Sequence, residues 1–101
     1  MEIQNIRNGD AAELFILGRI DGDGAHKLEV EILATMKSGA KAIYVNLGQA
    51  TFICSAGLSV LLRYFRQMKQ KQLLLQATRP SPEVDAVLQT SGFRDILVEK
   101  T

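Results

Sequence analysis

The spacing of apolar residues along this 101-residue chain alternates between two patterns. Short, nearly continuous apolar runs predict strands at residues 2–6, 12–19, 42–47, 73–77 and 96–99. The second run is apolar at every position from Leu14 to Leu17, which predicts a strand buried on both faces. Asn8-Gly9-Asp10 favours a hairpin between the first two strands, because Asn-Gly tolerates the positive φ of a tight turn.

Three longer segments between the later runs are apolar at helical spacing. The first follows Asp23, its expected N-cap, and ends near Gly39. The second begins near Ser55. The third opens with Ser-Pro-Glu at residues 81–83, a typical helix start, and ends at Gly92. Strands separated by helices predict βαβ crossovers, so we expect an α/β domain with a mixed, mostly parallel sheet.

Length and charge narrow the class of protein. The chain is long enough for one core, and we expect a single domain over residues 1–101. Twelve basic and eleven acidic residues give a net charge of +1, without the basic stripe typical of nucleic-acid binding. No apolar run approaches the roughly 20 residues of a membrane span, and residues 1–10 lack the regions of a signal peptide. With one cysteine and no export signal, the predicted location is cytoplasmic.

The clearest candidate chemistry lies at residues 54–57, Cys-Ser-Ala-Gly, where a buried strand gives way to an amphipathic helix. Ser55 can cap that helix, and its hydroxyl can also accept a phosphate. The first N–H groups of a helix are unpaired and carry partial positive charge, so a phosphate is favourably placed there. We interpret Ser55 as a regulated hydroxyl, which indicates a switch rather than a catalyst.

Other reactive side chains are few. Asp21 and Asp23 can be interpreted as paired carboxylates for acid–base chemistry, but capping a helix in a glycine-rich loop is the simpler interpretation. His26, the only histidine, is expected on the solvent face of a helix, and Cys54 is expected to be a small packing thiol. One histidine and one cysteine cannot make a four-ligand zinc site alone, so the sequence predicts no metal and no cofactor.

The run VNLGQATFICSAGLSVLLRYF, residues 45–65, resembles the signature of the STAS domain, the fold of bacterial anti-sigma-factor antagonists. That family shows Phe-Ile-Asp-Ser, a small residue, then Gly-Leu and a helix. Phe52-Ile53 and Ser55-Ala56-Gly57-Leu58 fill those places, with Cys54 where the family usually has Asp. Residues 18–21 resemble the segment before the family's first helix, and residues 82–93 its last helix and the following turn.

Two further departures accompany Cys54. Asn46 stands where the family commonly has Asp at the end of a strand, and residues 69–72 lack the glycine that often closes the second helix. The likeness nevertheless extends over nearly the whole chain in the right order. It implies a single STAS-like domain whose helices pack mainly on one face of the sheet.

The resemblance implies a regulator and not an enzyme. In that family, the serine at the position of Ser55 is phosphorylated by an anti-sigma factor that is also a serine kinase. The unphosphorylated antagonist binds this partner and frees the sigma factor, the phosphorylated form is released, and a serine phosphatase resets the cycle. The implied partner-binding surface consists of residues around the start of the second helix and before the first: Asp21, Asp23, Cys54, Ser55, Ala56, Gly57 and Ser59.

Two alternatives from other classes stay open. One is a constitutive scaffold that forms a homodimer or assembles with other STAS proteins, its serine never modified. The other is a small thiol enzyme that uses Cys54, because a helix N-terminus can lower the pKa of a thiol.

Overall fold

Strands and helices alternate from the second strand to the third helix, as the spacing of apolar residues predicts. The computed structural model describes residues 1–98. Its elements are β1 (Glu2–Asn8), β2 (Ala11–Ile20), α1 (Gly22–Lys37), β3 (Ala42–Ile53), α2 (Ser55–Gln70), β4 (Leu74–Thr78), α3 (Pro82–Ser91) and α4 (Arg94–Leu97).

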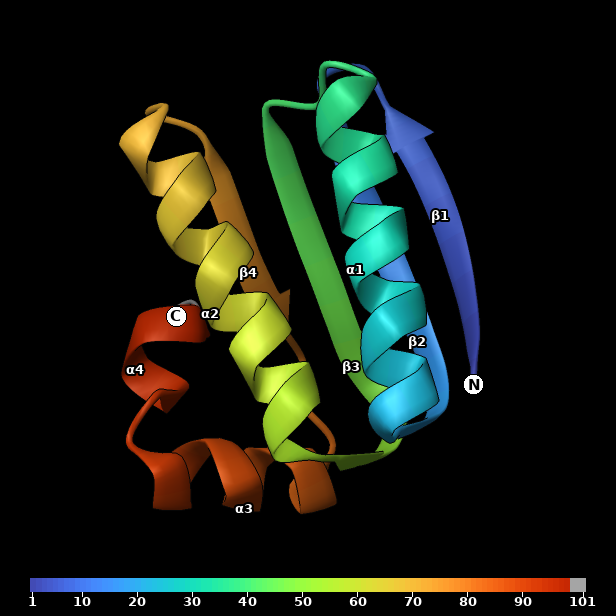
Figure 1. Ribbon diagram of the computed structural model, residues 1–101, viewed down its shortest axis with the longest axis vertical. Helices are drawn as coiled ribbons and strands as arrows, with labels where there is room; N and C mark the ends of the chain where they lie inside the picture. Colours follow the sequence, from blue (N-terminus) through green and yellow to red (C-terminus); the bar gives the residue numbers. More distant parts are fainter. Residues whose placement is uncertain (99–101) are drawn as a thin grey trace.

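The four strands form one sheet in the order β1-β2-β3-β4. β1 and β2 are antiparallel and joined by a tight turn in which Gly9 has a φ of +63°. β2 with β3 and β3 with β4 are parallel, and α1 and α2 are the two crossover helices. Figure 1 shows α1 and α2 side by side on one face of the sheet, with α3 beyond the end of the sheet where α2 begins. The predicted mixed, mostly parallel sheet with helices mainly on one face is confirmed.

The core lies between this sheet and the two crossover helices. Its largest fully buried side chains come from every layer: Leu14, Ile16, Ile20, Leu28, Ile32, Ile43, Leu47, Leu61, Met68, Leu75, Leu88 and Leu97. Along β2, however, Leu14 and Ile16 are buried while Phe15 and Leu17 are only half-buried. The prediction that this strand is buried on both faces is therefore wrong, because α1 and α2 cover only one face of the sheet.

β3 is longer than the predicted 42–47 and runs on to Ile53. Its pairing with β2 shifts register between Phe15 and Leu17, which lie opposite Asn46 and Gln49. The Asn46 side chain holds this irregular stretch, because its Oδ1 accepts from the Gly48 N–H at 3.0 Å and its Nδ2 donates to Glu13 Oε2 at 3.1 Å. The bulge lets β3 continue to the point where α2 begins.

The strand predicted at residues 96–99 is wrong for Ile96 and Leu97, which are helical. The chain leaves α3 through Gly92, at a φ of +81°, and makes one more short helix, α4. Leu97 is buried, and its N–H donates to the Phe93 carbonyl at 3.0 Å. Val98, which follows α4, is extended and pairs with Ala77 of β4 in a parallel bridge. Glu99, the last residue of the predicted strand, lies outside the described residues.

The ends of the helices follow the expected turn chemistry with one exception. α1 ends at a left-handed Gly39, with a φ of +91°, and α3 ends at Gly92, both as predicted. After α2 no glycine is available, and Gln72 takes the left-handed conformation with a φ of +60°. The departure from the family pattern at residues 69–72 thus leaves the turn in place with a residue that is strained there.

Candidate functional site

The candidate site forms where β2 and β3 end side by side. Ile20 pairs with Ile53, and the Cys54 N–H donates to the Ile20 carbonyl at 2.9 Å. α1 starts directly after Asp21, the residue that follows Ile20, and α2 starts directly after Cys54. This backbone hydrogen bond therefore brings together the two segments that were predicted to contribute to the partner-binding surface, residues 21–23 and residues 54–59.

Gly57 fixes the height of α2 above the sheet. It is buried, and a Cβ at this position would lie 2.6 Å from Ile20 Cγ2 and 3.0 Å from Ile53 Cγ1. Real Cβ atoms do not approach other carbons this closely, so only glycine lets the first turn of α2 rest on the ends of β2 and β3. Gly57 was expected to be part of the partner-binding surface. In the structure it is buried beneath that surface, between α2 and the ends of β2 and β3.

Ser55 is the first residue of α2 and is exposed. The N-cap is Cys54, whose side chain caps no N–H group, so the expectation that Ser55 caps the helix is wrong. Among residues 1–98, the Ser55 hydroxyl has no hydrogen-bond partner. The free N–H groups of the first turn and an unengaged hydroxyl therefore occupy the same exposed helix end.

Asp21, and not the expected Asp23, is the N-cap of α1. Its Oδ1 accepts from the Gly24 N–H at 2.9 Å, and its carbonyl accepts from the Ala25 N–H at 2.7 Å. The helix starts two residues earlier than the sequence suggested, which places Asp23 in its first turn, exposed. Both carboxylates stand at a helix N-terminus, so helix stabilisation accounts for them without acid–base chemistry.

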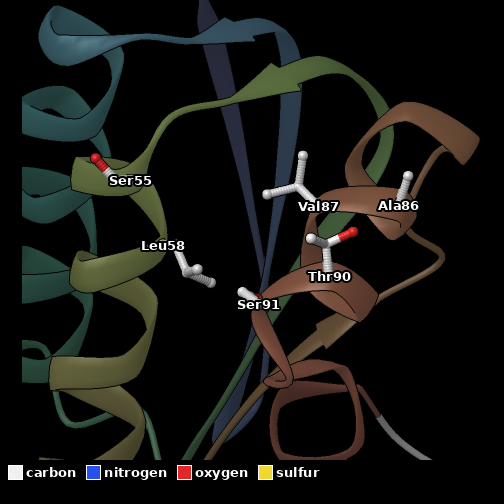
Figure 2. A pocket seen from close by; sticks show the side chains of 6 residues that line it. All are labelled: Ser55, Leu58, Ala86, Val87, Thr90 and Ser91. Atoms are coloured by element: carbon white, nitrogen blue, oxygen red, sulfur yellow. The ribbon is translucent and has the colours of Figure 1, made fainter.

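A groove of about 410 Å³ separates the first turns of α2 from α3. It is lined by Ser55, Leu58, Ala86, Val87, Thr90 and Ser91. In Figure 2, Leu58 and Val87 point toward the space between the two helices, and the Ser55 hydroxyl stands at the start of α2 and points away from α3. The candidate hydroxyl thus lies at the rim of a mainly apolar groove. The sequence does not show that Leu58 and Val87 line a groove, because this depends on how α3 packs against α2.

A second groove, of about 380 Å³, runs between α1 and α2. Ala56 and Ser59 line it from α2, His26 and Glu29 from α1, and Arg63 closes it one turn further on. His26 is exposed, as predicted. Ser55 and Ser59 thus line different grooves on either side of α2, so the predicted partner residues divide into two surfaces.

Glu29 ties α1 to α2 at the end of this second groove. Its Oε2 accepts from the Tyr64 hydroxyl at 2.7 Å and from Arg63 Nη1 at 2.5 Å. The Tyr64 hydrogen bond and the charge of Arg63 hold the pKa of the Glu29 carboxyl below its ordinary value. Burial raises the pKa of the Tyr64 phenol. The sequence carried no signal for this contact, because it depends on how the two helices pack.

Within residues 1–98, no three His, Cys, Asp or Glu side chains gather as a group that could hold a metal ion. None of the helices described is both long and apolar enough to cross a membrane.

Comparison with known proteins defines the family. The family model described as "Mlab, STAS domain" matches residues 3–99. A protein of Bordetella bronchiseptica named as anti-sigma factor antagonist BtrV is 34% identical over 79 residues, which is 78% of this chain and 68% of that protein. The chain therefore belongs to the STAS domain family and, within it, to the anti-sigma factor antagonists.

Solved structures share the fold at low sequence identity. An anti-sigma factor antagonist from Mycobacterium paratuberculosis superposes with a TM-score of 0.86 at 19% identity, covering 99% of this chain and 86% of that one. The antagonist SpoIIAA in its unphosphorylated form gives 0.84 at 20% identity, covering 99% and 88%. The phosphorylated form of SpoIIAA, a Bacillus cell fate determinant, gives 0.77 at 18% identity, covering 99% and 91%.

Proposed function

We propose that this anti-sigma factor antagonist binds an anti-sigma factor with serine-kinase activity and is released when that kinase phosphorylates Ser55. The observation that carries the proposal is the position of Ser55, exposed at the start of α2 and at the rim of an apolar groove. A serine phosphatase would reverse the modification. The cycle would run in the cytoplasm, where transcription is controlled.

Phosphorylation at this point is compatible with the folded domain. A phosphate adds about −1.5 to −2 charge at pH 7. At the N-terminus of a helix, negative charge is stabilising by roughly 0.3–1 kcal/mol. Cys54 leaves the first N–H groups of α2 without a side-chain cap, so they are free to donate to a phosphate.

The same charge opposes binding. A partner that covers the groove buries Leu58 and Val87, and we place the edge of this interface over Ser55, whose hydroxyl stands on the outer side of the rim. A dianion at that rim would have to lose its hydration against an apolar surface, which is strongly unfavourable. A phosphate on Ser55 that the folded domain accommodates but the partner interface does not would release the partner without unfolding the domain. SpoIIAA, which shares the fold, occurs in an unphosphorylated and a phosphorylated form.

Cys54 distinguishes this chain from the family pattern. An uncharged residue beside the phosphoacceptor removes a like charge that would otherwise lie next to the phosphate. We therefore infer that the kinase of this protein recognises the serine through the neighbouring helix surface, Ala56 and Ser59, without a carboxylate at position 54.

The test is affinity capture from a lysate of the source organism with three immobilised proteins: unmodified, Ser55→Asp, and Gln70→Glu as a control with added charge at the far end of α2. We expect the unmodified and control proteins to retain an ATPase that Ser55→Asp does not retain. The purified ATPase should then transfer phosphate from ATP to the unmodified chain and to Ser38→Ala, a change at the exposed end of α1 away from Ser55, but not to Ser55→Ala. Equal capture by all three proteins, or capture of other STAS proteins alone, would support the constitutive scaffold instead.

A further inference from the structure

Half of the twelve cations of the chain lie at the end of the domain farthest from Ser55. We call this the basic end; its charged residues are Arg7, Asp10, Lys37, Lys41, Arg66, Lys69 and Lys71, all exposed. Six of these seven are cations, so the basic end carries a net charge of +5, and the rest of the chain carries −4. The net charge of the whole sequence, +1, therefore does not show that positive and negative charge lie in different parts of the domain. In Figure 1 the basic end is where α1 and α2 finish, opposite α3.

Hydrogen bonds join the segments of the basic end into one surface. The Lys41 N–H donates to the Asp10 carbonyl at 2.7 Å, and the Leu74 N–H, just after the turn at Lys71, donates to the Lys41 carbonyl at 3.1 Å. Arg7 Nη1 donates to the Ser38 hydroxyl at 2.6 Å, beside Lys37. The β1–β2 turn and the two loops that follow α1 and α2 are therefore in contact.

Within residues 1–98, most of the positive charge of the basic end is not paired with carboxylates. Asp10 is the one carboxylate of the basic end, and it approaches Lys41 at 3.9 Å with both side chains about 70% exposed. α2 has no acidic residue in its 16 positions. Lys37 and Lys69 complement the dipoles of the helices they end, but Arg7, Lys41 and Lys71 lie outside the helices. Helix stabilisation therefore explains only part of the cluster.

We propose that the basic end binds the anionic headgroups of a phospholipid bilayer as a peripheral, electrostatic contact. Flexible lysines spread over a broad end surface suit a layer of headgroups, which attracts each nearby cation. No aromatic residue is among those that define the basic end, and all six aromatic residues of the chain are buried or half-buried, which disfavours stacking on the bases of a nucleic acid.

If the basic end contacts a bilayer, the opposite end of the domain, with Ser55, stays accessible to a protein partner. The 16 residues of α2 separate the two ends by about 24 Å, since a helix rises 1.5 Å per residue. That is roughly three times the distance of about 8 Å over which physiological salt screens charge. A phosphate on Ser55 therefore leaves the attraction of the basic end unchanged, and the bilayer contact is independent of the proposed switch.

The test is co-sedimentation of the whole chain with phosphatidylcholine vesicles that contain or lack phosphatidylglycerol. We expect binding only to the anionic vesicles, lost as salt rises. Replacing both Lys69 and Lys71 by Gln should reduce the partition coefficient about tenfold or more, since each lysine near an anionic surface is worth roughly fivefold. The matched control replaces Lys27 and Arg79, two exposed cations outside the basic end, and should keep most of the binding.

Three results would overturn the proposal. They are absence of binding to anionic vesicles at low salt, equal losses in the two double variants, and tighter binding to duplex DNA of the same phosphate concentration. Ser55→Asp should bind the vesicles as the unmodified chain does. Because this readout needs no protein partner, it can fail while the phosphorylation switch stands, and the reverse also holds.

Discussion

Gly57, in the first turn of α2, lies against Ile20 so closely that an added Cβ would stand 2.6 Å from Ile20 Cγ2. This contact joins the end of β2 to the start of α2 and sets where Ser55 emerges. The glycine of the family pattern is thus explained by packing underneath the site, since no larger residue fits between the helix and the two strand ends.

Gly57→Ala tests the close contact between Gly57 and Ile20, because two effects predict opposite signs for the change in the free energy of unfolding. Helix propensity alone would make alanine more stable than glycine by about 1 kcal/mol. The contact with Ile20 predicts the opposite, a loss of about 1–3 kcal/mol from overpacking. Chemical unfolding measures the difference. In a double-mutant cycle with Ile20→Ala, which removes the contacting carbon, the penalty of Gly57→Ala should shrink; a stabilised Gly57→Ala protein would contradict the account.

Asn46 tests whether the bulge of β3 depends on a neutral side chain. Its amide donates to Glu13 Oε2 at 3.1 Å, and an aspartate in its place would set two carboxylates against each other. We expect Asn46→Asp to lose about 1 kcal/mol at pH 7. Repulsion raises the pKa of the carboxylate pair in the folded state, so the deficit should be smallest in acid and grow as pH rises through that pKa.

The control for Asn46→Asp is its combination with Glu13→Gln, which restores a donor opposite the new carboxylate. Thermal unfolding of the double variant at pH 7 should recover most of the lost stability. A deficit that is the same at every pH, or that Glu13→Gln leaves untouched, would show that repulsion between the two side chains is not its cause.

Glu29 predicts a pH dependence on the acid side. Its pKa is lowered in the folded protein by the Tyr64 hydrogen bond and the charge of Arg63. The stabilisation it provides is therefore complete above the ordinary carboxyl pKa of 4.5 and is lost as pH falls through the lower folded value. Glu29→Gln should unfold less steeply with acid than the unmodified chain. Melting curves between neutral and acidic pH measure this, and identical slopes would contradict it.

Ala86 tests the groove between α2 and α3. It is exposed on α3 and lines the groove, so Ala86→Glu places a charged side chain where a partner's apolar surface would sit. We expect at least tenfold weaker binding to the anti-sigma factor, with stability changed by no more than about 0.5 kcal/mol, as for other surface substitutions. Gln67→Glu, on the exposed side of α2, adds the same charge outside the groove and should bind normally. Equal binding by both variants would exclude the groove from the interface.

The elements of this fold were predictable wherever local pattern decides them. The spacing of Leu28 and Ile32 gave the first crossover helix, and Asn-Gly gave the hairpin turn. The strand expected at residues 96–99 fails at its start, because Ile96 and Leu97 belong to the short helix α4, where Leu97 is buried. Periodicity cannot separate a short apolar strand from one buried helical turn.

The site was predictable in its position but not in its shape. Small residues between a strand and a helix located Ser55, and the family resemblance gave it a role. Which groove each neighbour faces, and that Asp21 rather than Asp23 caps α1, followed only from the packing of α1, α2 and α3. The clustering of cations at the basic end could not be predicted from the sequence either, because residues far apart in the chain meet there.

The central claim is that a phosphate on Ser55 weakens partner binding without unfolding the domain. The most direct measurement is isothermal titration of the purified anti-sigma factor with the unmodified chain and with the chain carrying phosphoserine at position 55, alongside the melting temperature of each. We predict a Kd at least about 30-fold weaker for the phosphorylated chain, equivalent to about 2 kcal/mol, with a melting temperature that is equal or higher. Equal Kd values, or weaker binding accompanied by loss of the fold, would contradict the account.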